Sequence, residues 1–421
     1  MRISRRTKRA LANLALFVGA LALSLALVEV VLHLMHPDRE LVSEDCFCEH
    51  DPMLGWRKIA GRKGWISHSE FGVFEEINSK GIRGPEYSYE KPANEFRILA
   101  LGDSFSEGYT VSFDKLFSER LKGNLNRRGD GRDYQVINTG TRAYSTDQEL
   151  LFFELEGRKY SPDLVVLMFC ENDLWYNTQP RYLATIGNDN RRYDKPVFRF
   201  EDGVLHLENV PVPQPDMPRM FSGVRRIRLI SWLASKSFIC DFLVGLLERA
   251  SFLSPGHQEL GTAENRDDRD VQAQMGRFCI LMGMPRTPEV QPAWDVTEAL
   301  LCRLRDDVER SAGKLIVFYV PTRESICGTS GDEAKPLEAA TDAGWDIEKV
   351  AKDLASVCER QSIPLISPTE EFRTKAAELK ERGARLYNVL DAHWTEKGHE
   401  LAGQILSEYI QANILSRDNR K

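Results

Sequence analysis

From Phe96 onward, short apolar runs of strand length alternate with longer amphipathic stretches of helical periodicity. Five apolar runs predict strands, at Phe96–Leu101, Gln135–Asn138, Leu164–Phe169, Lys314–Val320 and Pro364–Ile366. The intervening stretches predict helices near Asp114–Arg127, Thr146–Arg158, Trp294–Ser311, Trp345–Arg360 and Glu396–Ile414. Successive strands that are joined by helices pair in parallel, and the helices cover both faces of the sheet. The sequence therefore predicts an α/β fold with a doubly wound, mostly parallel five-stranded sheet.

The stretch from about residue 175 to 290 breaks this alternation, and we interpret it as an insertion after the third strand. Its first part predicts a hairpin, because alternating apolar positions in 196–200 and 204–207 flank the Asp-Gly turn of Glu201–Gly203. Further on, Ile227–Leu247 predicts an apolar helical segment that charged residues interrupt. We expect this segment to pack against the core, with an interfacial helix or a lid as the alternatives.

The N-terminal residues carry the pattern of a membrane segment. Five cations and no acid occur in residues 1–9, and an apolar run from Ala10 to Leu32 follows. As a helix this run would reach roughly 34 Å, enough for a hydrocarbon core of about 30 Å. We predict a cytoplasmic basic segment at 1–9 and a single-pass transmembrane anchor at 10–35, with the rest of the chain outside the cytoplasm by the positive-inside rule. The alternatives are a cleaved signal peptide, with small residues at Ala20-Leu21-Ala22, and a buried soluble helix.

Residues 36–94 are rich in glycine, proline and charge, and they contain short aromatic runs. We expect a stalk with small β elements there, followed by the α/β domain over residues 95–415. This division places the insertion, at about 175–290, inside the α/β domain.

Composition narrows the classes of ligand. The formal net charge is −7 although five cations lie in the first nine residues, so the remainder is acidic and nucleic-acid binding is disfavoured. Zinc-ligand spacings and phosphate-binding glycine loops do not occur, and we expect no metal and no cofactor. Eight cysteines could form up to four disulfides whose pairing stays open, and Cys170 is expected to be a buried thiol.

Two short motifs carry side chains that suit nucleophilic catalysis. Gly102-Asp103-Ser104 ends the first strand, where a turn into a helix would expose the Ser104 hydroxyl and aim its N–H at a developing oxyanion. Asp391-Ala392-His393 lies before the last helix, where Asp391 could orient the imidazole and His393 could deprotonate Ser104. Each motif alone also has a structural interpretation, as a helix cap or turn and as a surface loop.

Two further motifs lie between these along the chain. Asn138-Thr139-Gly140 follows the second strand, and Cys170-Glu171-Asn172-Asp173 follows the third. With Gly102-Asp103-Ser104-Phe105 and Asp391-x-His393 they form four blocks in the order typical of the SGNH/GDSL hydrolases, which this chain resembles over roughly 96–175 and 314–415. The resemblance implies a flavodoxin-like three-layer sandwich.

The resemblance also implies a role for each matching residue. Ser104 would be the nucleophile, with Asp391 and His393 as its acid–base partners. The oxyanion hole would combine the N–H groups of Ser104 and Gly140 with the side chain of Asn172. The chain departs from the family at Cys170, which occupies a position that is usually glycine, and this affects the expected geometry of the loop more than the role of Asn172.

Residues near these motifs are interpreted as structural rather than catalytic; they are Asp103 in the turn, Asp173 beside Asn172, Thr395 as a helix N-cap, and Trp394 and His399 in packing or at the surface. Arg142 and Tyr144 follow Gly140 closely enough to contact a substrate, and they could equally face solvent.

The function that this resemblance implies is hydrolysis of an extracytoplasmic carbohydrate or lipid ester through an acyl-enzyme. One alternative is an O-acyltransferase that O-acetylates a cell-envelope or secreted polysaccharide, with a membrane acyl-donor partner. Water and a sugar hydroxyl attack the same acyl-enzyme, so the residues do not separate these two activities. The second alternative is an inactive scaffold of the same fold, against which the intact set of candidate residues counts.

Overall fold

The computed structural model describes residues 5–35, 47–68, 70–186, 189–214, 237, 239–240, 243–244, 290–327 and 346–416. Contacts divide the chain into two compact units, one of residues 1–46, 64–66 and 217–264 and the other of residues 47–63, 67–216 and 265–421. The segment expected at Ile227–Leu247 lies almost wholly outside the described residues.

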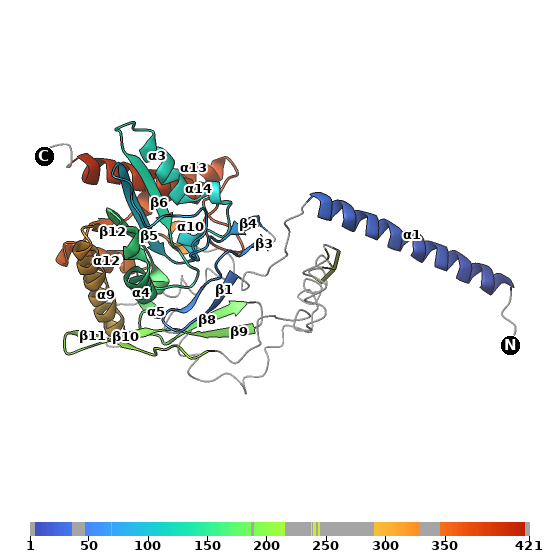
Figure 1. The fold of residues 1–421 in the computed structure, drawn as a ribbon, viewed down its shortest axis with the longest axis horizontal. Coiled ribbons are helices and arrows are strands. Elements are labelled where there is room, and N and C mark those ends of the chain that lie inside the picture. The colour runs from blue at the N-terminus through green and yellow to red at the C-terminus, as the bar shows by residue number, and fades with distance from the viewer. Residues whose placement is uncertain are drawn as a thin grey trace. The chain divides into compact units, whose positions relative to one another are not determined.

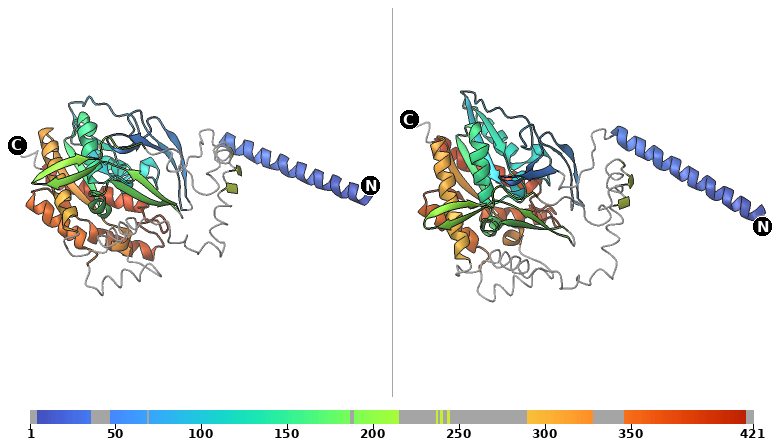
Figure 2. Two further views of the ribbon diagram at one scale, coloured as in Figure 1. Left: turned by 90° about the horizontal axis from the view of Figure 1, so that it is seen from below. Right: turned by 60° about the horizontal axis from the view of Figure 1, so that its bottom comes forward.

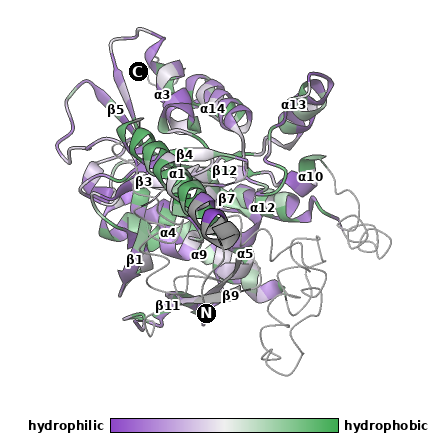
Figure 3. Ribbon diagram, turned by 90° about the vertical axis from the view of Figure 1, so that its right-hand side faces the viewer, coloured by the Kyte–Doolittle hydropathy of each residue, from purple (hydrophilic) through white to green (hydrophobic). Residues whose placement is uncertain are grey.

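The first unit contains a single long helix among its described residues, α1 (Arg5–Met35). Its portion Asn13–Leu34, 22 residues, is long and apolar enough to cross a membrane, and none of it is buried in the structure. Figure 3 shows apolar colouring over most of α1. By length and composition α1 fits either a single-pass anchor or a signal sequence.

The second unit is built on a five-stranded sheet. Its strands are β5 (Glu95–Gly102), β6 (Asp133–Asn138), β7 (Leu164–Cys170), β12 (Lys314–Val320) and β13 (Leu365–Ile366). They lie in the order β13-β12-β7-β5-β6, and every neighbouring pair is parallel. The order reverses between β5 and β7, so both sides of the sheet are wound from its centre. The predicted fold class is confirmed.

Helices cover both faces of this sheet (Figure 1). One face packs against α4 (Thr146–Leu155), α9 (Gln291–Arg310) and α12 (Lys349–Arg360). The other face packs against α3 (Phe117–Asn126), α13 (Thr369–Glu381) and α14 (Glu396–Ile410). Alternate residues of each strand enter opposite cores, as in β5, where Leu99 and Leu101 belong to the first and Ile98 to the second.

The helices differ from the expected ranges mainly at their ends. A 3₁₀ turn at Phe113–Lys115 (η2) precedes α3, another at Gly157–Tyr160 (η3) follows α4, and a π-helical turn at Gln411–Leu415 (η8) extends α14. The sequence did not predict α13 or the short helices α2 (Ser104–Glu107), α5 (Glu171–Tyr176) and α10 (Arg323–Cys327).

Most of the described residues before the sheet belong to the same compact unit as the sheet, whereas residues 64–66 belong to the first unit. The residues between α1 and the sheet include the short strands β1 (Cys48–Asp51), β2 (Gly55–Lys58), β3 (Lys63–Ser67) and β4 (Gly72–Glu76). Leu54, Trp56, Ile82 and Tyr87 are buried in the core that lies against one face of the sheet. The expected boundary at residue 95 therefore differs from the structure, in which the unit begins at Phe47.

The insertion begins with two hairpins. The strands β8 (Arg181–Ile186) and β9 (Asp189–Asp194) pair antiparallel, as do β10 (Val197–Glu201) and β11 (Val204–Glu208). The predicted β10–β11 hairpin is confirmed, and Asp202 and Gly203 have the positive φ values, 51° and 79°, of a tight hairpin turn. This hairpin packs against α9 (Figure 2).

Candidate active site

The turn after β5 presents Ser104 at the start of α2. Asp103 caps this short helix by accepting a hydrogen bond from the Phe105 N–H at 2.9 Å, and Gly108 ends it in the left-handed conformation with φ 65°. A Cβ at Gly102 would lie 2.6 Å from the Ser106 Cβ, so only glycine allows this close approach. The expected turn-shaping role of Asp103 matches this geometry.

Three candidate residues from opposite ends of the domain meet at this turn. The Ser104 Oγ lies 2.7 Å from the His393 Nε2, and the His393 Nδ1 lies 2.8 Å from the Asp391 Oδ1. In the tautomer that supports proton transfer, Nδ1–H donates to Asp391 and Nε2 accepts from the Ser104 hydroxyl. The segment that carries Asp391 and His393 leads into α14, where the Thr395 side chain accepts from the Lys397 N–H as an N-cap.

The electrostatics of these groups favour a charged imidazolium next to an ionised carboxylate. Burial alone would lower the pKa of His393, but the hydrogen bond and charge of Asp391, together with the charge of Asp103, raise it above its usual value. Burial alone would raise the pKa of Asp391, yet His393 and Tyr109 hold it below its usual value. Asp391 is therefore ionised at neutral pH and stabilises the proton that His393 takes up.

Asn172 lies in the first turn of α5, directly after β7, which is the neighbour of β5 in the sheet. Its side chain lies close enough to the Asp103 carboxyl to lower the pKa of that group, although burial raises it overall. Cys170, at the usual glycine position, has ordinary extended angles with φ −105° and ψ 152°, so the loop does not need a glycine. Burial raises the pKa of its thiol, and Cys170 is the inert buried cysteine that was expected. The six cysteines among the described residues form no disulfide.

Gly140, which was expected to offer its N–H to an oxyanion, is closely packed and hydrogen-bonded within the protein. Its N–H already donates to the Asn138 Oδ1 at 3.0 Å, and its carbonyl accepts a hydrogen bond from the buried Lys58 ammonium. A Cβ at this position would lie 2.4 Å from the Glu107 N and 2.6 Å from the Ser106 Cβ. Gly140 thus allows the loop after β6 to pack against α2, and its expected role as an oxyanion donor stays a prediction. On the same loop, Ala143 has φ 67° and an N–H with no hydrogen bond to any described residue.

Residues 100–237 match the family model described as the GDSL-like Lipase/Acylhydrolase family. The chain contains a GDSL-like lipase/acylhydrolase domain. The resemblance is confirmed over these residues, which include three of the four sequence blocks. No functionally curated protein matches the chain.

Solved structures of low sequence identity resemble the GDSL-like domain. An acetyl xylan esterase, AlAXEase, is 9% identical with a TM-score of 0.36, and the match covers 75% of this chain and 100% of that chain. TesA is 11% identical with a TM-score of 0.36, covering 75% and 98%. A lipase/acylhydrolase from Enterococcus faecalis is 13% identical with a TM-score of 0.34, covering 75% and 96%.

A tyrosine that sequence reasoning missed completes the surroundings of Asp391 in the GDSL-like domain. The Tyr109 hydroxyl donates to the Asp391 Oδ2 at 2.7 Å and lies 3.2 Å from the His393 Nδ1. The Arg142 guanidinium lies over the Tyr109 ring at 4.5 Å, and the Phe71 ring meets its edge at 5.8 Å. One feature of the sequence could have indicated that Tyr109 lies near the nucleophile: it directly follows Gly108, the glycine that ends α2.

Arg142 belongs to a buried group of charges behind the nucleophile turn. The members of this group are Lys58, Glu75, Arg83, Glu107 and Arg142. Burial alone would raise the pKa of Glu107, but Arg142 and Lys58 lower it to about 2. Because Glu107 is in α2, this group fixes the helix that begins at Ser104. Arg142 therefore forms ion pairs within the fold, and the expectation that it could simply face solvent does not hold.

A second buried group is rich in carboxyls. It consists of Asp103, Asp147, Glu149 and Asp173, with Lys195 as the cation bound to Asp147. Burial and the neighbouring carboxyls raise the pKa of Glu149 well above its usual value, which favours the protonated side chain. Both of its oxygens lack hydrogen-bond partners among the described residues. Those residues include no group of three or more His, Cys, Asp or Glu side chains that could hold a metal ion.

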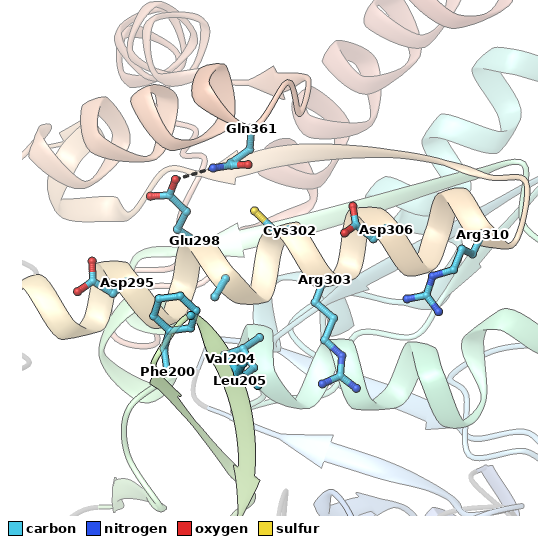
Figure 4. A pocket seen from close by; sticks show the side chains of 12 residues that line it. Phe200, Val204, Leu205, Asp295, Glu298, Cys302, Arg303, Asp306, Arg310 and Gln361 are labelled. Carbon is cyan, nitrogen blue, oxygen red and sulfur yellow. Dashed lines mark hydrogen bonds between the residues drawn. The ribbon is translucent and has the colours of Figure 1, made fainter.

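A groove of about 670 Å³ lies between α9 and the β10–β11 hairpin of the GDSL-like domain. Figure 4 shows Phe200 of the hairpin and Glu298, Cys302 and Arg303 of the helix lining it. Ser104, Asn172, Asp391 and His393 are not among its lining residues. The groove is therefore separate from the candidate active site.

Proposed function

We propose that this protein is a serine-dependent esterase that forms an acyl-enzyme on Ser104. The observation that carries the proposal is the relay from Ser104 through His393 to Asp391, with contacts of 2.7 and 2.8 Å. A hydroxyl, a neutral imidazole and an ionised carboxylate in this order form the general arrangement of an activated serine nucleophile. The family of the domain supports the same reaction class.

The reaction proceeds in two steps. In the first, the Ser104 Oγ attacks the ester carbonyl while His393 takes its proton, and collapse of the tetrahedral intermediate expels the alcohol, which receives that proton. In the second, His393 removes a proton from water, the hydroxide attacks the acyl-enzyme, and the acid leaves as Ser104 regains its proton. The Ser104 N–H and the Asn172 amide are the proposed oxyanion donors. Gly140 stays the third proposed donor.

The proposed substrate is a carbohydrate or lipid ester outside the cytoplasm. Two features support this setting: the five cations in residues 1–9 and the apolar helix α1 that follows them. The helix would hold the catalytic unit at the membrane surface. A reporter fused after Lys421 tests the orientation, because a reporter active only in the cytoplasm would contradict both the topology and this substrate class.

Transfer of the acyl group to a sugar hydroxyl remains the alternative outcome of the same acyl-enzyme. A time course of p-nitrophenyl acetate cleavage by the full-length protein in detergent, with and without added oligosaccharide, separates the two. We expect release that disappears in Ser104→Ala, with acetate as the second product. Acetyl groups on the sugar would establish a transferase, and the absence of Ser104-dependent release and of acyl-enzyme by mass spectrometry would favour an inactive scaffold.

A further inference from the structure

Glu70 lies on the turn between β3 and β4 and binds the loop that carries Asp391. One carboxylate oxygen accepts the Val389 N–H at 2.7 Å, and the other accepts the N–H groups of Leu390 and Asp391 at 2.8 and 3.0 Å. Burial alone would raise the pKa of Glu70, but these N–H donors outweigh it and hold the pKa below its usual value. Glu70 is therefore ionised at neutral pH, and its bonds belong to the stronger, charge-assisted class.

Apart from Glu70, the Arg323 guanidinium holds this loop by donating to the Val389 carbonyl at 2.5 Å. The side chains of Val389 and Leu390 are 45% and 71% exposed, so they contribute little packing. Ala392, between Asp391 and His393, has φ 67°, a conformation that costs a non-glycine residue of order 1–3 kcal/mol and persists only when its surroundings impose it. A strained, exposed segment would relax if its backbone donors were released.

We propose that Glu70 is a positioning residue that holds Asp391 in the orientation needed by His393. The inference rests on the esterase function proposed above and adds to it a residue from outside the four sequence blocks. Glu70 acts through the backbone of residues 389–391 and does not touch the reacting atoms.

The same hairpin reaches Asp391 by a second route. Glu75 of β4 binds Arg142, whose guanidinium lies over the Tyr109 ring, and the Tyr109 hydroxyl donates to the Asp391 Oδ2. Glu70 thus fixes the backbone of Asp391, while Glu75 supports the tyrosine that fixes its carboxylate. Two residues of one hairpin that precedes the sheet therefore act on the same catalytic carboxylate.

The test compares Glu70→Gln and Glu70→Ala with the matched control Glu76→Gln in the full-length protein. Glu76 is an exposed carboxylate of the same hairpin whose partner is Lys63. Glutamine keeps the size of Glu70 but has one acceptor oxygen, and its NH₂ group would face a backbone donor. We expect kcat for p-nitrophenyl acetate to fall about 10- to 100-fold with KM little changed, because a displaced relay loses rate rather than binding.

Two further readouts separate positioning from a merely structural role. A fluorophosphonate probe reports Ser104 directly, since its Oγ displaces fluoride from phosphorus, and labelling should slow by a similar factor. The acid limb of the pH–rate profile should move to lower pH, because a misplaced Asp391 no longer raises the pKa of His393. Thermal unfolding shows whether Glu70→Ala is folded, and if it is not, Glu70→Gln decides.

The outcomes are distinct. Wild-type kcat and an unshifted acid limb in Glu70→Gln would overturn the inference, as would a loss of rate that follows the loss of thermal stability with no change in the acid limb. A wild-type protein that neither cleaves the ester nor reacts with the probe would instead remove the esterase function, and the inference with it. Slower labelling with a shifted acid limb in Glu70→Gln, but not in Glu76→Gln, is the result that supports positioning.

Discussion

Replacing Gly140 with alanine tests whether this residue serves the site by its missing side chain or by its N–H. The new Cβ would lie 2.4 Å from the Glu107 N and 2.6 Å from the Ser106 Cβ. Ordinary contacts begin near 3.4 Å, so α2 and the loop after β6 must separate by about 1 Å. Overpacking of this kind costs about 1–3 kcal/mol of stability. A displacement of that size at Ser104 costs roughly 100-fold in rate.

The assay for Gly140→Ala is ester hydrolysis together with thermal unfolding, and Gly123→Ala is the matched control. Gly123 lies within α3, where a new Cβ would meet nothing closer than the Arg127 side chain at 3.7 Å. Alanine there should leave activity unchanged and raise stability by up to about 1 kcal/mol. Alanine retains the backbone N–H at residue 140. Wild-type rate and stability in Gly140→Ala would therefore refute the packing argument.

Three further results are expected. Asn172→Ala should lower kcat about 100- to 1,000-fold if its amide binds the oxyanion, and burst kinetics would show the loss in the acylation step. The kcat/KM of the wild type should fall as pH drops through the raised pKa of His393, above its ordinary 6.5, and a limb below that value would contradict the Asp391 contact. Glu149→Gln should lose less stability than the wild type as pH rises above 4.5, measured by urea unfolding at several pH values. The folded protein keeps a proton on Glu149 that the unfolded chain releases, so unfolding becomes easier for the wild type with rising pH.

The central strands could be predicted almost to the residue, because a parallel strand that is buried on both faces forms a continuous apolar run. β12 has the predicted bounds, Lys314–Val320, and β7 extends only one residue beyond its predicted end. By contrast, α13 was missed because its inward face is narrow: only Phe372 and Leu379 are buried, and most of the other residues are charged. The strands β8 and β9 were also missed, because neither sequence has the strict apolar alternation of a half-buried strand.

Candidate-site residues could be predicted where they stand in a short sequence motif, and could not where only the fold brings them to the site. Ser104, His393 and Asp391 each stand in a short block, and the structure brings them together. Glu70 contacts its loop through backbone N–H groups more than 300 residues away, a relation that no residue type reveals. Gly140 shows a second reason why the sequence is insufficient. A motif can require glycine for its accessible N–H or because a side chain would not fit, and only the packing in the structure distinguishes these two reasons.

The relay joins a residue at the beginning of the sheet to one just before the last helix, 289 positions later. A ribosome that has synthesised the whole sheet, through β13, has still not supplied the imidazole. The nascent chain is therefore catalytically silent until translation is nearly complete, and a product truncated before residue 393 would carry the serine without its base. With the proposed topology and esterase function, this order of synthesis would delay ester cleavage until the domain has crossed the membrane.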